Sequence, residues 1–221
     1  LNEALSSLCY LGPLRAVPKR HRVQWDDANL HDRPGLDSWA RIGAEVQVQE
    51  VVNRWLGSGC FGTPYRLKTR RLVYDDDPSK GVGPPDILFD DGCTGLQLSH
   101  RDLGFGITQV LPILVNAASL NKGIVAIEQP ELHLHPAMQA ELGDVFIESA
   151  LGERKNTFLL ETHSEHLILR IMRRIRETHL DKLPKEKNLP PVRPSDVAVL
   201  YVEKQGPRSI VREFPLNERG E

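Results

Sequence analysis

The sequence contains little cysteine, and what it has excludes a disulfide framework. Only Cys9, Cys60 and Cys93 occur among 221 residues, an odd number without the spacing of metal ligands. A small secreted domain or a zinc ribbon would need a denser and more regular set. We therefore expect a reduced protein located in the cytoplasm.

Long apolar runs and an excess of one charge are also absent. No apolar run approaches ~18 residues and no signal peptide is visible, so we expect no membrane span. The net charge of −2 gives no overall attraction to nucleic acid, and nucleic-acid binding would need a local patch. Arg170, Arg173, Arg174 and Arg176 could form one, but acidic residues follow them, so we expect a solvated surface.

The first 98 residues are irregular and rich in glycine, proline and charge. Residues 44–56, AEVQVQEVVNRWL, repeat apolar side chains at close to 3.6 residues and predict a helix. Strands are predicted over 66–75 and 86–92. We interpret residues 1–98 as a peripheral lobe or an inserted subdomain.

Residues 99–221 are more regular and predict an α/β fold with a mostly parallel sheet and flanking helices. Apolar runs of strand length alternate with stretches of helical period. The predicted elements are a helix over 106–118, a strand over 124–128, a helix from Pro136, a strand over 157–162, a helix over 164–180 capped by Ser164, and a hairpin of 197–204 with 209–216.

The strand over 124–128 ends abruptly in Glu128-Gln129-Pro130-Glu131. A buried parallel strand of this kind delivers polar groups to a site at its carboxyl end. Glu128 suits Mg²⁺, which prefers oxygen ligands. Gln129 cannot accept a proton but can orient water, and Glu131 or Glu161 can act as base or relay. The alternative is that Glu128 merely ends a buried strand.

Two further segments carry candidate chemistry. In GFGITQ (104–109), Gly104 and Gly106 precede a helix whose backbone N–H groups can bind an anion, and Thr108 offers a hydroxyl one turn on. His163 follows the strand over 157–162, where its imidazole can donate a hydrogen bond to a phosphate oxygen. The alternatives are a simple turn and an ordinary polar histidine.

Together these segments resemble the ATPase head of ABC-type proteins, in particular the SMC, RecF and overcoming-lysogenisation-defect group of predicted AAA ATPases. GIVAIEQPE (123–131) resembles the Walker B strand and LHLHP (132–136) the D-loop. GFGITQ resembles the signature segment, usually LSGG followed by Gln, although Gly104 stands where serine is usual. His163 resembles the switch histidine. The specific resemblance covers about 105–165.

The resemblance implies a P-loop fold that binds ATP and Mg²⁺ and hydrolyses ATP between two heads of a dimer. The implied catalytic residues are Glu128, with Mg²⁺, Gln129, Glu131 and His163. The implied nucleotide-binding residues are Gly104, Gly106, Thr108, Gln109 and His135. Hydrolysis would move an effector protein or a DNA-bound element, which implies DNA maintenance or anti-phage defence.

The Walker A loop, G-x-x-x-x-G-K-[ST], does not occur in these residues. The sequence also begins with Leu1 rather than methionine. We therefore expect the C-terminal half of a head, whose partner is an N-terminal half that carries Walker A. A weaker likeness lies in YLGPLRAVPKR (10–20), where Arg15 could approach a phosphate but is expected to be a surface residue.

Two alternative functions stay open. Because Gln129 lacks a basic carboxylate, the protein could be a nucleotide-gated interaction switch with little turnover. Alternatively, His133, His135 and His163 could hold zinc or manganese together with nearby carboxylates, as in a metallohydrolase.

Overall fold

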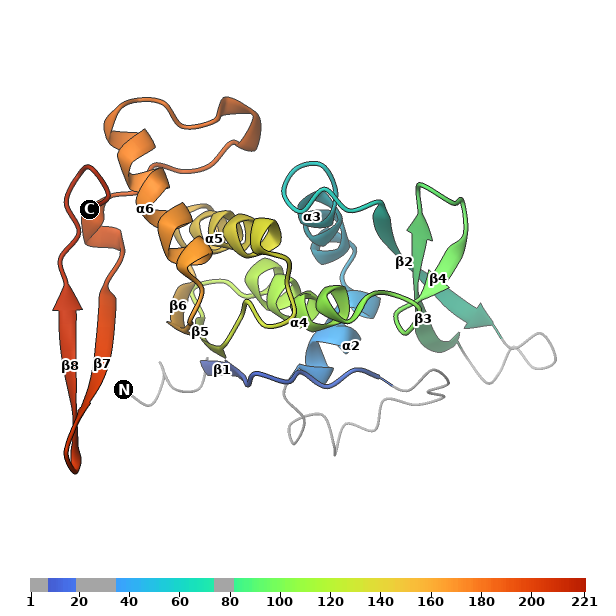
Figure 1. Ribbon diagram of the computed structural model, residues 1–221. Coiled ribbons are helices and arrows are strands. Elements are labelled where there is room, and N and C mark those ends of the chain that lie inside the picture. The colour runs from blue at the N-terminus through green and yellow to red at the C-terminus, as the bar shows by residue number, and fades with distance from the viewer. Residues whose placement is uncertain (1–7, 19–34, 74–81) are drawn as a thin grey trace.

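The structure of the protein, a computed structural model, describes residues 8–18, 35–73 and 82–221 (Figure 1). At its centre is a parallel sheet in the order β1-β5-β6, built from β1 (Leu8–Leu11), β5 (Ile124–Glu128) and β6 (Thr157–Glu161). Helix α5 (Pro136–Leu151) connects β5 to β6. The predicted α/β class with a parallel sheet and flanking helices is confirmed.

The sheet is covered unevenly. In β5, Val125 and Ile127 are buried, as the apolar pattern predicted. The prediction of a buried strand was wrong for β6, where Leu159 is 65% exposed. The reason is that α5 covers one face of β6, where Phe158 packs against Phe146, whereas among the described residues Leu159 and Glu161 on the other face are left exposed.

Helix α4 (Phe105–Ser119) lies at the centre of the core and contains Pro112. Its side chains from Ile107 to Ala118 are all buried. Helices α2 (Leu36–Ala44) and α3 (Val46–Leu56) pack against it. The helix predicted over 44–56 is confirmed as α3, whereas α2 was not predicted.

The antiparallel sheet β2-β3-β4 lies beside these helices (Figure 1). It is formed by β2 (Tyr65–Val73), β3 (Val82–Asp91) and β4 (Gln97–Ser99). The strands predicted over 66–75 and 86–92 correspond to β2 and the later part of β3. Between β1 and β5 the pairing runs Leu8 with Ile124 to Leu11 with Ile127, so the N-terminal part contributes a strand to the central sheet. The division into 1–98 and 99–221 stays a prediction.

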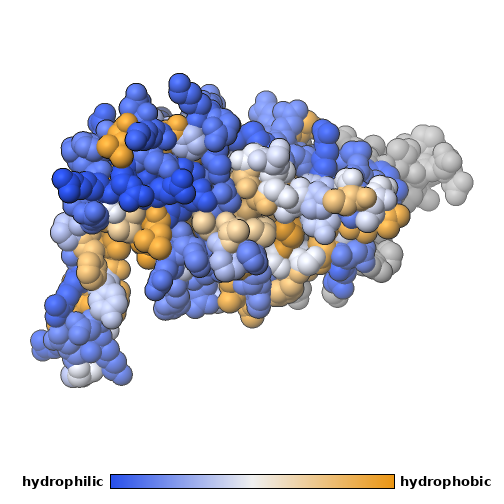
Figure 2. Space-filling view, turned by 45° about the horizontal axis from the view of Figure 1, so that its top comes forward, coloured by the Kyte–Doolittle hydropathy of each residue, from blue (hydrophilic) through white to orange (hydrophobic). Residues whose placement is uncertain are grey.

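The C-terminal part continues with α6 (Glu165–His179), which lies beside α5 (Figure 1). Short 3₁₀ helices η3 (Lys185–Lys187) and η4 (Pro194–Asp196) precede the hairpin of β7 (Val199–Gln205) and β8 (Arg208–Phe214). This confirms the predicted hairpin. Figure 2 shows hydrophobic side chains on it, and Leu200, Val202 and Val211 are each more than half exposed.

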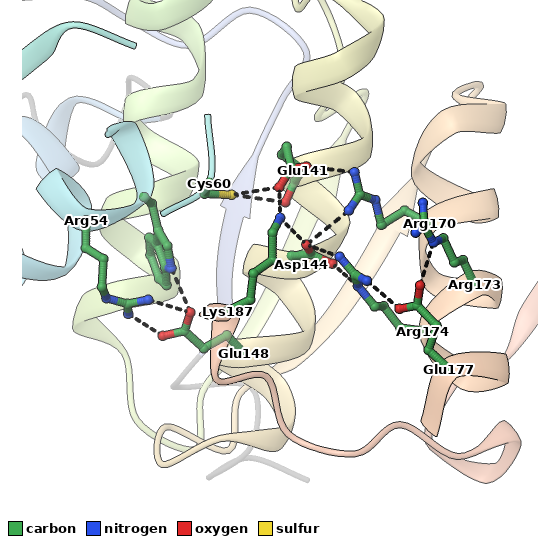
Figure 3. A network of polar contacts seen from close by, with 11 residues as sticks. Arg54, Cys60, Glu141, Asp144, Glu148, Arg170, Arg173, Arg174, Glu177 and Lys187 are labelled. Atoms are coloured by element: carbon green, nitrogen blue, oxygen red, sulfur yellow. Dashed lines mark hydrogen bonds and ion pairs between the residues drawn. The ribbon is translucent and has the colours of Figure 1, made fainter. Parts of the chain in front are cut away.

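A buried polar network joins α5 and α6 (Figure 3). Arg174 is 2% exposed, so the prediction of a solvated arginine was wrong there. Its Nε and Nη2 atoms donate to the two carboxylate oxygens of Asp144, each at 2.8 Å. Arg170 and Lys187 also donate to Asp144, at 3.3 and 2.8 Å. Of the four arginines in α6, Arg174 is thus the buried one, because α5 supplies a buried carboxylate.

The charges of this network reinforce each other. Burial alone would raise the pKa of Asp144, but the hydrogen bonds from Arg174 and Lys187 outweigh it and hold that pKa below its ordinary value. Burial likewise opposes the charge of Arg174, yet its bonds to Asp144 raise its pKa.

Within the described part of the chain, none of the helices has the length and apolar character needed to cross a membrane.

Candidate nucleotide site

The carboxyl ends of β5 and β6 lie side by side. Glu128 pairs in register with Glu161, and the backbone N–H of Gln129 donates to the carbonyl of Glu161 at 2.8 Å. Because both strands run in the same direction, the residues after each strand meet at one edge of the sheet. The structure therefore brings together Glu128, Gln129, Glu161 and His163.

The backbone of Gln129 is in the left-handed region, with φ 44°. This conformation costs a residue with a side chain on the order of 1–3 kcal/mol and persists only where the surroundings fix it. Arg15 supplies part of that fixation, because its Nη2 donates to the carbonyl oxygens of Glu128 at 2.6 Å and Gln129 at 3.2 Å. The side chain of Gln129 is thus carried on a tightly defined turn.

Arg15 is 3% exposed, so its expected place on the surface was wrong. Its backbone is held by the amide of Gln109, which accepts from the Arg15 N–H at 2.8 Å and donates to its carbonyl at 3.0 Å. Burial lowers the pKa of Arg15 to about 10, while the nearby charge of Glu131 opposes that change. In the described part of the chain, its Nε and Nη1 have no hydrogen-bond partner.

Glu131 holds the loop that follows β6. Its Oε2 accepts from the hydroxyl of Thr162 at 2.7 Å, and its Oε1 accepts from the backbone N–H of His163 at 2.8 Å. The Thr162 hydroxyl in turn accepts from the backbone of Ser164 at 3.0 Å. These contacts favour a positioning task for Glu131, and the catalytic role predicted for it stays a prediction.

His163 projects from this loop, and its side chain is 78% exposed. Its Nε2 lies 3.1 Å from Oε1 of Glu161, whose side chain is 50% exposed. The other oxygen of Glu161 accepts from the backbone N–H of Gln129 at 3.3 Å. Glu161 is therefore the carboxylate that touches both Gln129 and His163.

Glu128 receives a hydrogen bond from the hydroxyl of Tyr10, at 2.8 Å to its Oε1. This bond raises the pKa of Tyr10.

In the described residues, no three His, Cys, Asp or Glu side chains come together as a metal site. One carboxylate at a strand end suits Mg²⁺, which usually takes one or two protein carboxylates together with waters and phosphate oxygens. The donor set therefore fits Mg²⁺.

The histidines of the D-loop-like segment have other contacts. The ring of His133 meets that of Phe105 edge to face, with centroids 4.7 Å apart. His135 caps α5, where its Nδ1 accepts from the backbone of Ala137 at 3.3 Å. Among the residues that the structure describes, His133, His135 and His163 do not come together in a cluster that could hold a metal, as the metallohydrolase alternative requires. The prediction that His135 contacts nucleotide stays a prediction.

The start of α4 abuts this loop. A Cβ on Gly106 would lie 2.4 Å from the carbonyl oxygen of His133, so only glycine permits the approach. Gly104, the N-cap, faces open space and stays a predicted phosphate contact. Thr108 is 4% exposed and its hydroxyl donates to the Phe105 carbonyl at 2.8 Å. In this arrangement the Thr108 hydroxyl is engaged within α4, and its nucleotide-binding role stays a prediction.

Gln109 is likewise engaged within the fold. It is 2% exposed and both ends of its amide bind the backbone of Arg15, which favours a positioning task, and its nucleotide contact stays a prediction. Sequence reasoning missed Tyr10 at the site, whereas Thr162 ends the predicted strand over 157–162, directly before His163. The available signal for Tyr10 was the apolar run before Gly12, because a short strand there was needed to bring Tyr10 to Glu128.

Comparison with known proteins shows the family of this chain. A sequence model of the AAA ATPase domain family matches residues 48–168, more than half of the chain. The chain belongs to the AAA ATPase domain family. Family membership supports an ATPase function, and it confirms the predicted resemblance to an AAA ATPase. A search of curated proteins found no match.

Two solved structures resemble this AAA ATPase domain. The crystal structure of the SMC head bound to the C-terminal winged-helix domain of ScpA has 12% identity and a TM-score of 0.50, and the match covers 77% of this chain and 43% of that one. At this identity the likeness shows the fold alone. A structure from work on ATP-driven dimerization and DNA-stimulated activation of SMC ATPases has 11% identity and a TM-score of 0.45, covering 75% of this chain and 84% of that one.

Proposed function

We propose that this AAA ATPase domain binds and hydrolyses ATP with Mg²⁺ as part of an ABC-type head. The supporting observation is the meeting of Glu128, Gln129 and His163 at the carboxyl edge of the parallel sheet. A hydride-transfer or acyl-transfer site would need other groups, whereas a carboxylate, an amide and a histidine at this edge suit phosphoryl transfer.

Each residue has a defined task in this proposal. Glu128 holds Mg²⁺, which neutralises charge on the phosphate oxygens when bound. The Gln129 amide orients the attacking water. His163 donates a hydrogen bond to the γ-phosphate, and its exposed ring is free to reach a ligand. Arg15, Glu131 and Gln109 keep the supporting turns in place.

The partner in this proposal is a segment that carries a Walker A loop, since these residues contain none. Among the described residues, no strand pairs with the outer edge of β6, and Leu159 on its open face is 65% exposed. An unpaired edge with an exposed leucine is a favourable place for another strand to add. We assign this edge to the Walker A segment.

The quaternary and cellular parts of the proposal follow from the resemblance. Two heads would close around ATP, with Gly104 and Gly106 of one facing the phosphates held by the other. Closure would move an effector protein or a nucleic-acid element in DNA maintenance or anti-phage defence, in the cytoplasm. A low-turnover nucleotide-gated switch is the second candidate, favoured by the amide at Gln129, which cannot serve as a base.

The test uses the complete head with its Walker A segment. We expect ATP-dependent dimerisation and steady phosphate release, with release abolished in His163→Ala. His166→Ala, which removes an exposed histidine in the first turn of α6, is the matched control and should leave release unchanged. Dimers without phosphate release would instead favour the switch. A protein that neither binds ATP nor dimerises with it would refute both.

A further inference from the structure

Hydrolysis at this site needs a proton acceptor, and the residue that follows β5 cannot be one. Gln129 is an amide, which orients water but does not take its proton. Three carboxylates lie near it at the edge of the sheet: Glu128, Glu131 and Glu161. Their contacts distinguish them.

Two of the three carboxylates have other tasks. Glu131 is half-buried and accepts short hydrogen bonds from Thr162 at 2.7 Å and from the backbone of His163 at 2.8 Å, whereas the two contacts of the exposed Glu161 are longer, 3.3 and 3.1 Å. Glu128 accepts a hydrogen bond from Tyr10 and is the proposed Mg²⁺ residue. A bound metal ion would lower the affinity of this carboxylate for a proton. Neither is well placed to serve as a base.

Glu161 differs from both. Its side chain is half exposed on the open face of β6, so water can reach it. One oxygen lies 3.3 Å from the backbone N of Gln129, and the other lies 3.1 Å from Nε2 of His163. It thus lies beside the backbone of the residue proposed to orient water and beside the imidazole proposed to reach phosphate.

We propose that Glu161 is the general base of this AAA ATPase domain and supplies the carboxylate that Gln129 lacks. This inference rests on the ATPase function proposed above. As the water oxygen bonds to the γ-phosphorus, one water proton passes to Glu161. The bond from that phosphorus to the β,γ-bridging oxygen breaks, and its electron pair leaves with ADP. His163 then relays the proton from Glu161 to the phosphate product.

The test compares the single variant Glu161→Gln with a double variant in which the amide and the carboxylate at positions 129 and 161 are exchanged. In the complete head, Glu161→Gln should lower kcat roughly 100- to 10,000-fold with little change in KM, as loss of a general base does. The double variant Gln129→Glu with Glu161→Gln moves the carboxylate to the neighbouring position and should recover most of the loss. Glu165→Gln, on the exposed first turn of α6, is the control and should retain wild-type kcat.

A second readout does not depend on turnover. Glu161→Gln should still dimerise with ATP, and chromatography of the nucleotide released from the purified dimer should find ATP rather than ADP. A residue that merely held His163 in place would lose ATP-dependent dimerisation together with kcat, and the double variant would not rescue it.

The outcomes separate the two proposals. Wild-type protein that hydrolyses ATP, with Glu161→Gln within about threefold of it, would overturn the base and leave the ATPase function standing. Loss without rescue in the double variant would also overturn it. Wild-type protein without ATP binding would refute the function itself.

Discussion

Replacing Asp144 by asparagine should destabilise the protein strongly, because it removes the anion on which three cations converge. Asp144 is 3% exposed, and Arg174, its bidentate partner, is 2% exposed. Asparagine keeps the shape of the side chain but cannot match the charge of Arg174, Arg170 and Lys187. The substitution therefore leaves a buried guanidinium with an incomplete counter-charge.

The size of the effect follows from the burial of the pair. Removing one partner of a buried ion pair costs about 3–5 kcal/mol. Arg174 keeps a bond to Glu177, so we expect the lower end, about 3 kcal/mol, or roughly a hundredfold change in the folding equilibrium. Denaturation in urea, followed by far-ultraviolet circular dichroism, measures it as a fall in the free energy of unfolding.

A matched exposed pair gives the control. Asp86 contacts Arg70 at 3.0 Å, with side chains 36% and 58% exposed, so Asp86→Asn should cost no more than about 1 kcal/mol. Adding Arg174→Met to the Asp144 variant removes the stranded charge and should recover part of the loss. An Asp144→Asn protein as stable as Asp86→Asn would refute the reasoning.

Three further predictions concern stability. Gly106→Ala should cost about 1–3 kcal/mol in urea unfolding because its Cβ would meet the His133 carbonyl, whereas Gly104→Ala, in open space, should cost much less. Ser164→Ala removes the N-cap of α6 and should lower the free energy of unfolding by about 0.5–2 kcal/mol. An unfolding curve identical to that of the wild type would contradict this prediction. The pKa of Asp144 is lower folded than unfolded, so its contribution is complete above its ordinary 3.8 and lost as pH falls through the folded value; the stability gap between wild type and Asp144→Asn should close below that pH.

The elements with a strong local pattern were predicted from the sequence. The apolar run 124–128 is β5, and Ser164 caps α6 by accepting from the backbone of Leu167 at 3.2 Å. Pro136 begins α5, as proline at a first turn favours. In each case the signal and the structure lie within the same few residues, so no distant contact was needed to interpret them.

The parts that were missed depend on contacts far apart in the chain. Arg15 and Glu128 are 113 residues apart, and nothing local in YLGPLRAVPKR indicates that the guanidinium is buried under the end of β5. The open face of β6 was missed for a related reason: TFLLE is apolar enough for a buried strand, but burial depends on which element covers it. Pattern fixes the element, whereas its neighbours decide its exposure.

The loop after β5 shows why the sequence predicts the location of the site but not its backbone conformation. Gln129 and His133 both have positive φ, at 44° and 65°, although neither is glycine. At roughly 1–3 kcal/mol each, these conformations need outside support. That support comes from Arg15 on the carbonyl of Gln129 and from the close packing of Gly106 on the carbonyl of His133. Stability gained elsewhere in the fold thus holds the backbone N–H of Gln129 beside Glu161, an arrangement that the local sequence would not adopt by itself.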